Sequence, residues 1–137
     1  MQSRWNLENK KALVTGGTKG IGRAIAKELA LFGAQVCVVS RSAADISELQ
    51  KQTDKSITGI EQDLSLPGSY ANIIEHVKKT YGGLDILVNN VGMNIRKKTI
   101  EYSIEEYEKI IQTNLTSAFE LSRMAYPLLK ASGEGNV

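Results

Sequence analysis

The sequence has very little of what builds disulfide-linked or metal-binding proteins. Among its 137 residues are one cysteine and one histidine. The single cysteine, Cys37, excludes an internal disulfide framework, and a single histidine excludes a histidine-rich metal site, so we expect no bound metal. Because Cys37 lies within the apolar run VCVV, we expect a buried thiol that packs like a small hydrophobic side chain, not a nucleophile.

Long apolar runs and an excess of one charge are also missing. No apolar run is long enough to cross a bilayer, and the net charge is only +2, with lysine and arginine dispersed along the chain. The sequence therefore indicates neither a nucleic-acid partner nor a membrane surface. Residues 1–14 do not contain the apolar core of a signal peptide, so we expect a cytoplasmic protein.

The composition suits one globular domain. Apolar residues make up 42% of the chain, which is enough for a core, and we treat residues 1–137 as a single domain. Short β-branched runs predict strands at Ala12–Thr15, Gln35–Val39, Ser56–Glu61 and Leu84–Val88. They alternate with longer segments of helical periodicity, which predicts βαβ crossovers and an α/β fold with a doubly wound parallel sheet.

Helical periodicity predicts which side chains face that sheet. Apolar positions recur every three or four residues at Ile21, Ile25, Leu29 and Phe32, with Gly33 as a C-cap, and again at Tyr70, Ile73, Ile74, Val77 and Tyr81. A longer stripe comprises Ile104, Tyr107, Ile111, Leu115, Ala118, Ser122, Ala125 and Leu129.

The long stripe has a clear start and an expected interruption. Ser103 and Glu106 fit a capping box at its beginning. The stripe is long for one helix, so we expect two helices or a break near Asn114. Because proline disturbs a helix interior, we also expect a kink at Pro127. Periodicity alone does not distinguish a stripe that faces the sheet from one that faces a partner.

The stretch TGGTKGIG, residues 15–22, lies where the first strand ends and a helix begins. A helix N-terminus attracts phosphate, and glycine allows both positive φ and close backbone approach. We expect Gly16 to make the turn, Gly20 to admit a diphosphate and Gly22 to let the helix pack closely. The alternative is a glycine-rich turn without a ligand, but the strand before it and the amphipathic helix after it favour dinucleotide binding.

The end of the second strand bears on which dinucleotide binds. NAD-dependent enzymes usually carry Asp or Glu there for the ribose 2′-hydroxyl, whereas this chain has Ser40 and Arg41, and the nearest acid is Asp45. Lys19 adds a cation within the glycine loop. We expect Arg41, Lys19 and the Ser40 hydroxyl to bind the 2′-phosphate of NADP(H). The alternative is that both cations are ordinary solvated side chains.

Four motifs in order resemble the short-chain dehydrogenase/reductase family: TGGTKGIG, DLS at residues 63–65, NNVG at residues 89–92 and QTNL at residues 112–115. The segments NLENKKALVTGGTKGIG, VVSR and PLLKASGEGNV look most like tropinone-reductase-like members. The resemblance covers nearly the whole chain. It implies a Rossmann fold, NADP(H) as the cofactor and a small carbonyl or alcohol as the substrate.

The resemblance also implies roles for individual residues. Asp63 would accept a hydrogen bond from the adenine amino group beside the Leu64 amide, and Asn89 would stabilise a strand end. Asn114 would hold a water for a proton relay, although a helix-bending amide is the alternative. The remaining cofactor contacts that the resemblance implies are Thr18 and Ile21 in the glycine loop, and Asn90, Val91 (in place of the usual alanine) and Gly92 beneath the adenosine ribose and diphosphate.

Members of the family protonate the carbonyl with a serine and a Tyr-x-x-x-Lys pair that follow the next strand. This chain ends at GNV, where that strand should begin, so we expect a sheet cut short after about four strands. Tyr126 and Lys130 have the Tyr-x-x-x-Lys spacing, but they precede that strand, Pro127 lies between them, and the apolar stripe suggests that Tyr126 is packed. We therefore do not expect them to be catalytic.

Two functions remain open on these grounds. The first is an NADPH-dependent ketone reductase or alcohol dehydrogenase, represented by its cofactor-binding part, inactive alone and homo-oligomeric when full length. Members of the family commonly pair through helices of the Ser103–Leu129 region. The second is a non-catalytic dinucleotide-binding or regulatory module that ends at residue 137.

Overall fold

The computed structural model describes residues 5–53 and 55–137. Four parallel strands form one sheet in the order β3-β2-β1-β4. These are β1 (Lys11–Thr15), β2 (Gln35–Ser40), β3 (Ile57–Glu61) and β4 (Ile86–Val88). In the register of the sheet, Leu13 lies between Cys37 of β2 and Leu87 of β4. The four expected strands are confirmed, with small differences at their ends.

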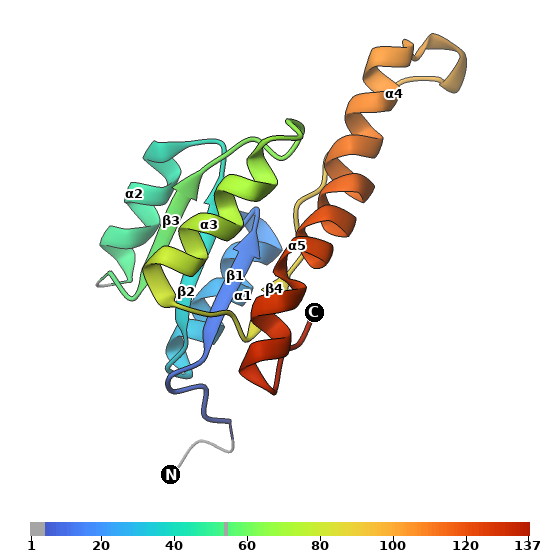
Figure 1. Cartoon of the computed structure of the whole chain (residues 1–137). Coiled ribbons are helices and arrows are strands. Elements are labelled where there is room, and N and C mark those ends of the chain that lie inside the picture. The colour runs from blue at the N-terminus through green and yellow to red at the C-terminus, as the bar shows by residue number, and fades with distance from the viewer. Residues whose placement is uncertain (1–4, 54) are drawn as a thin grey trace.

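Helices cover both faces of this sheet (Figure 1). Helices α1 (Gly20–Leu31) and α2 (Ala43–Gln52) pack on one face, and α3 (Ser69–Tyr81) and α5 (Ser117–Ser132) on the other. The 3₁₀ turn η1 (Thr99–Glu101), helix α4 (Ile104–Ile111) and the π-helical turn η2 (Gln112–Thr116) lie between β4 and α5. The doubly wound arrangement expected from the alternating pattern is therefore confirmed.

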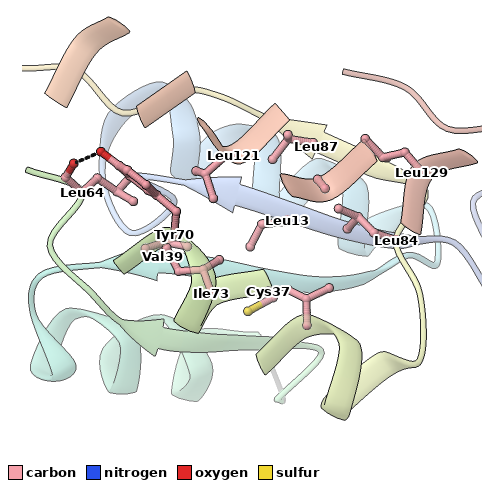
Figure 2. Close-up of a cluster of buried hydrophobic side chains, with 12 residues drawn as sticks. Leu13, Cys37, Val39, Leu64, Tyr70, Ile73, Leu84, Leu87, Leu121 and Leu129 are labelled. Carbon is pink, nitrogen blue, oxygen red and sulfur yellow. Dashed lines mark hydrogen bonds between the residues drawn. The ribbon is translucent and has the colours of Figure 1, made fainter. Parts of the chain in front are cut away.

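Alternating side chains of each strand supply two cores. Leu13, Cys37 and Leu87 point toward α3 and α5, as Figure 2 shows, whereas Ala12 and Val14 point toward α1 and α2. Because both faces are covered, apolar residues occupy successive positions and the strands read as continuous apolar runs. Cys37 is fully buried, and burial raises the pKa of its thiol to about 11, so the expectation of a buried thiol is confirmed.

The expectation for α3 is confirmed, but that for α1 is wrong at its first position. Tyr70, Ile73 and Val77 are buried beneath α3, and Tyr70 Oη donates to the carbonyl oxygen of Leu64 at 2.9 Å (Figure 2). Ile21 is 75% exposed. The buried residues of α1 are Gly22 and Ala26, and Ile21 lies on the exposed side of the helix.

The last helical region confirms its start and its break. The Ser103 hydroxyl accepts from the Glu106 amide at 3.2 Å, while the Glu106 carboxylate accepts from the Ser103 amide at 3.0 Å, which completes the capping box. The break near Asn114 is a π-helical turn, η2, that joins α4 to α5. Pro127 lies inside α5, which continues through it to Ser132.

The expectation of one continuous stripe is wrong. Ile104, Tyr107 and Leu115 are exposed by 63%, 54% and 63%. A π turn contains more residues than an α turn, so positions before and after it do not share one face. Ala125 and Leu129 of the expected stripe are buried, so the expectation is confirmed for these two. They belong to a buried line that runs at intervals of four through Thr113, Ser117, Leu121, Ala125 and Leu129.

The outer edge of β4 pairs with the segment that follows α5. Leu87 is 1% exposed because α5 covers it. Its amide donates to the carbonyl oxygen of Asn136 at 3.0 Å, and the Asn136 amide donates to that of Asp85 at 2.9 Å, so the segment after α5 pairs in parallel with β4. In the part of the chain that the structure describes, no helix has the length and apolar character needed to cross a membrane.

Candidate cofactor site

A cavity of about 490 Å³ opens at the carboxyl ends of the strands. In the order β3-β2-β1-β4 the chain winds outward from β1 in both directions, and ligands of such sheets bind at this reversal point. Most of the expected site residues meet there. Those that line the cavity are Gly16, Thr18, Lys19, Gly20, Ser40, Arg41, Asp63, Leu64, Asn90, Val91 and Gly92.

Three expected site residues do not line the cavity. Ile21 points to solvent, Gly22 is buried in the first turn of α1, and Asn114 lies on η2 behind the segment that follows Gly92. Gly22 instead leaves room for Asn90 and Gly16, and Asn114 bonds to Met93, all of which line the cavity. Direct contact with a cofactor stays a prediction for all three.

The glycine loop adopts the backbone that its sequence predicts. Gly16 and Gly20 have φ of +63° and +54°, a left-handed conformation that side chains disfavour. A Cβ atom on Gly20 would meet nothing within 4 Å, so open space surrounds this residue within the cavity. No side-chain hydrogen bond caps α1 and its first turn carries no acidic residue, so nothing on that helix competes with an anion for its first amides.

Gly22 is required for a close approach, but its partner is not a strand side chain. A Cβ atom there would lie 2.3 Å from Asn90 Nδ2 and 2.4 Å from the Gly16 carbonyl oxygen. Asn90 Nδ2 donates to the carbonyl oxygens of Thr15 and Gly16 at 3.0 and 3.2 Å. The Asn90 side chain therefore clamps the glycine loop from below.

The expectation for the two adjacent asparagines needs a correction. Asn89 Nδ2 donates to Ser122 Oγ at 3.1 Å, so Asn89 does tie the end of β4 to α5. Asn90, expected only to pass beneath the cofactor, stabilises the end of β1 through its side chain as well. Val91 fits in place of alanine because its side chain packs partly against the core under α3 and α5.

Thr15 is a supporting residue that sequence reasoning missed. Its Oγ1 accepts from the amides of Asn90 and Val91, both at 3.0 Å, and so joins the end of β1 to the loop after β4. Gly17 was also missed: a Cβ atom there would lie 2.5 Å from Val38 Cγ1. A signal for Thr15 was present, since a hydroxyl side chain ends the strand directly before the glycines.

The end of β2 carries a cluster of hydroxyl and basic groups. Thr18 Oγ1 donates to Ser40 Oγ at 3.1 Å, and the Ser42 amide donates to the same oxygen at 3.2 Å. Ser42 Oγ in turn accepts from the Asp45 amide at 3.1 Å and so caps α2. The glycine loop and the loop after β2 are therefore held together around Ser40, with Arg41 lining the same cavity.

Lys19 of the glycine loop forms an ion pair with Asp45. Its Nζ lies 2.8 Å from Asp45 Oδ2, and the Lys19 side chain is 77% exposed, that of Asp45 31%. The hydrogen bond from Lys19 lowers the pKa of the Asp45 carboxyl from its ordinary value. Asp45, the nearest acid after the end of β2, thus contacts the cation of the glycine loop.

Asp63, in the loop after β3, is held as a carboxylate where it lines the cavity. Its Oδ1 accepts from the Ser65 amide at 2.9 Å and from the Ser65 hydroxyl at 2.8 Å. Partial burial acts to raise its pKa, but these hydrogen bonds and the charges of Arg41 and Lys109 lower it, and the net pKa is below the ordinary value. Both bonds fall on Oδ1, so an ionised oxygen remains for a donor such as an adenine amino group.

Asn114 braces the far wall of the site through a reciprocal pair of hydrogen bonds. Its Oδ1 accepts from the Met93 amide and its Nδ2 donates to the Met93 carbonyl oxygen, both at 2.8 Å. The side chain therefore fixes the segment that follows Gly92 and does not bond within its own helix. A role in holding water is not tested by this geometry and stays a prediction.

Further residues that line the cavity could not be read from local patterns. Gln62 and Ser65 flank Asp63 and were within reach of sequence reasoning. Lys109 and Thr113 come from α4 and η2, and only the folding of the chain brings them to the ends of the strands. The complete set of lining residues that were missed is Val39, Ser42, Asp45, Gln62, Ser65, Met93, Lys109 and Thr113.

The Tyr126 and Lys130 pair lies elsewhere. Tyr126 is 59% exposed, so the expectation that it packs is wrong, and Lys130 Nζ lies 5.9 Å from the centroid of its ring. Neither residue lines the cavity. Among the described residues, no group of three or more His, Cys, Asp or Glu side chains is placed to hold a metal ion.

Comparison with known proteins gives a consistent set of relatives. The profile of the family described as short chain dehydrogenase matches residues 10–137. A tropinone reductase homolog from Arabidopsis thaliana is 49% identical over 138 residues, which are 98% of this chain and 52% of that protein. A tropinone reductase homolog from Datura stramonium is 42% identical, with the same coverage of each chain.

Similarity extends to solved structures. The crystal structure of a protein described as a short-chain alcohol dehydrogenase from Sinorhizobium meliloti 1021 superposes with a TM-score of 0.83 and 32% identity. The match covers 90% of this chain and 50% of that chain. This chain therefore spans about half the length of the relatives that it matches.

Proposed function

This chain belongs to the short-chain dehydrogenase family, and we propose that it is the cofactor-binding part of an NADP(H)-dependent oxidoreductase that interconverts a ketone and its alcohol. Residues 1–137 would form the N-terminal part of a longer Rossmann domain in a cytoplasmic enzyme. The family acts on small molecules, and the similarity to tropinone reductase homologs favours a carbonyl substrate.

One observation carries the choice of NADP(H). Ser40 and Arg41, at the end of β2, line the same cavity as Thr18 and Lys19 of the glycine loop. A 2′-phosphate bound there would meet hydroxyl and cationic donors on both loops. Charge-assisted hydrogen bonds contribute about 1.5–3 kcal/mol each, so two of them are enough for more than a tenfold preference over NADH.

The rest of the cavity suits the remaining groups of the cofactor. The open space at Gly20 and the uncapped first turn of α1 fit a diphosphate, whose charge the helix N-terminus stabilises. The ionised Asp63 fits an adenine amino group, and residues Asn90–Gly92 would pass beneath the ribose. When bound, NADPH supplies the hydride, and this part of the chain orients it.

We propose that the proton in such a reaction comes from a serine and a Tyr-x-x-x-Lys pair outside these 137 residues, as the family resemblance implies. The 137 residues span about half the length of the relatives, which is consistent with this proposal. We expect Asn114 to hold a water for the proton relay, and the 137 residues alone to bind cofactor without turning over substrate.

We further propose that the full-length protein is a homo-oligomer. Large apolar side chains stand exposed along the outer side of the last helices, at Ile104, Tyr107, Leu115, Phe119 and Tyr126. Exposed apolar patches of this kind commonly mark interfaces.

Calorimetric titration of the chain with NADPH and with NADH tests the cofactor assignment. We expect NADPH to bind at least tenfold more tightly, and Arg41→Ala to remove most of that difference while leaving NADH little changed. Arg96→Ala is the matched control, because it removes a positive charge from an exposed position that does not line the cavity. Equal losses for both cofactors in Arg41→Ala would refute the 2′-phosphate assignment.

A further inference from the structure

The acid at the phosphate end of the cavity has no role in the function proposed above. Asp45 is the third residue of α2, and it lines the cavity beside Ser40 and Arg41. Its amide donates to Ser42 Oγ, and this N-cap fixes the backbone position of Asp45. Because Asp45 Oδ2 lies 2.8 Å from Lys19 Nζ, the pair joins the loop after β2 to the glycine loop.

Both partners of this ion pair line the cavity together with Ser40 and Arg41, where the proposed function puts the extra phosphate of the cofactor. Lys19 carries one ammonium group, and its side chain is 77% exposed and free to turn. A 2′-phosphate near Ser40 and Arg41 must either take Lys19 from Asp45 or share it. The phosphate would also lie close to the Asp45 carboxylate, and two negative groups a few ångströms apart repel each other.

We propose that Asp45 is a specificity-determining residue that competes with the 2′-phosphate of the cofactor for Lys19. This inference rests on the proposed function, since it assumes that NADP(H) occupies the cavity. Asp45 lowers the affinity for NADPH below what Ser40, Arg41 and Lys19 give by themselves. NADH has no 2′-phosphate, so its affinity does not depend on this competition. Asp45 therefore reduces the difference in affinity between NADPH and NADH.

The other two cations, Arg41 and Lys109, act on the Asp63 carboxylate, which faces the cavity from the loop after β3. Lys19 is the cation that pairs with Asp45. The availability of Lys19 to the phosphate therefore depends on Asp45, while Arg41 and the Ser40 hydroxyl remain as the other donors.

The first test is calorimetric titration of Asp45→Asn with NADPH and NADH. We expect the Kd for NADPH to fall about three- to tenfold and that for NADH to stay within about twofold, because a half-exposed ion pair and one repulsive charge act only on the phosphate. The gain should shrink as salt is added, since screening weakens both effects. Asp45→Ala repeats the test with a different side chain, and thermal unfolding checks that both variants are folded.

Two further variants separate this mechanism from a general charge effect. Glu48→Gln removes a negative charge one turn further along α2, where Glu48 accepts a hydrogen bond from Gln52 and does not line the cavity. It should leave both affinities within about twofold of the unsubstituted chain. In a Lys19→Gln background, Asp45→Asn should give a smaller gain than in the natural chain, because there is no lysine to release.

The outcomes distinguish the inference from the function on which it rests. If the unsubstituted chain does not prefer NADPH, the proposed function fails whatever Asp45 does. If it prefers NADPH but Asp45→Asn leaves that Kd unchanged, or changes both cofactors equally, only the competition is refuted. An equal gain from Glu48→Gln would likewise overturn the specific role of Asp45.

Discussion

The glycine loop and the arm formed by α4, η2 and the start of α5 are built in opposite ways. In the loop, a Cβ atom on Gly22 would overlap the Asn90 side chain and the Gly16 carbonyl oxygen, and hydrogen bonds join Thr15 to Asn90. In the arm, which Figure 1 shows extending past the sheet, α4 buries no residue at all. The difference teaches that contacts between loops preorganise a binding site, whereas an amphipathic helix that packs against nothing leaves its apolar side chains exposed.

The largest expected effect separates the two sides of the long helix. Leu121→Ala should lower the free energy of unfolding by about 2–5 kcal/mol, because Leu121 is fully buried against the sheet. Leu115→Ala should change it by less than about 0.5 kcal/mol, because that side chain is 63% exposed. Urea unfolding of the two variants measures both values.

Equal losses for the two leucines would mean that the arm is covered in solution. Size-exclusion chromatography with light scattering then identifies the cover. If copies of the chain associate through the arm, Leu115→Ser should shift the population toward monomers at a given concentration, whereas Lys79→Ser, on an exposed part of α3, should not.

The next effect is inside the glycine loop. Gly22→Ala should destabilise the chain by about 1–3 kcal/mol and abolish tight NADPH binding, since its Cβ would overlap Asn90 Nδ2 and the Gly16 carbonyl oxygen. Gly68→Ala is the control: like Gly22 it has no positive φ, but open space surrounds it and it does not line the cavity. It should retain NADPH affinity, and a matching loss there would show that the overlap with Asn90 and Gly16 is not the cause of the loss at Gly22.

Asn114→Ala probes the joint between the two regions and should have a moderate effect. It removes both hydrogen bonds to Met93, worth about 1 kcal/mol each, from an exposed site. We expect faster hydrogen exchange of the Met93 amide and a several-fold weaker NADPH affinity, with little change in the exchange of β1 amides. Unchanged exchange at Met93 would contradict the brace that the structure shows.

The smallest change in stability at pH 7 is expected in the core beneath α3. The contribution of this core to the free energy of unfolding should decrease at alkaline pH, whereas that of the glycine loop should not. Burial raises the pKa of Tyr81 to about 12 and that of Cys37 to about 11. Both groups are neutral when protonated, so their stabilisation is complete below their ordinary values of 10.0 and 9.0 and is lost as pH rises through about 11 to 12. Tyr81→Phe should lower stability at pH 7 by about 1 kcal/mol and flatten the alkaline decline in urea titrations.

Much of the fold could be predicted because its signals are local. Strands covered on both faces read as apolar runs, the capping box lies within four residues, and the glycines mark a strand followed by a helix. Ile21 shows the limit of such reading: spacing finds an apolar stripe, but only the approach of α1 through Gly22 and Ala26 selects the side that faces the sheet. The π turn at Asn114 likewise rotated the last stripe in a way that regular periodicity cannot represent.

The candidate site divides in the same way. Its glycines, Ser40, Arg41 and Asp63 follow strand ends, and the carboxyl ends of parallel strands meet at one edge, so sequence reasoning could bring them together. The Asn90 clamp, the Lys19–Asp45 pair and the contribution of Lys109 could not be found in this way. Each joins residues from different loops, and their distance depends on how the helices pack.

The sequence by itself determined that this chain forms a parallel sheet with a glycine-rich turn between its first strand and its first helix. Those properties follow from short-range backbone preferences and from the side-chain pattern. Only the tertiary structure decided which acid reaches which lysine, which asparagine holds the turn and which side of the last helix stays exposed. Such choices depend on distances of a few ångströms between segments far apart in the chain, and hydrogen bonds and ion pairs lose their strength over just that range.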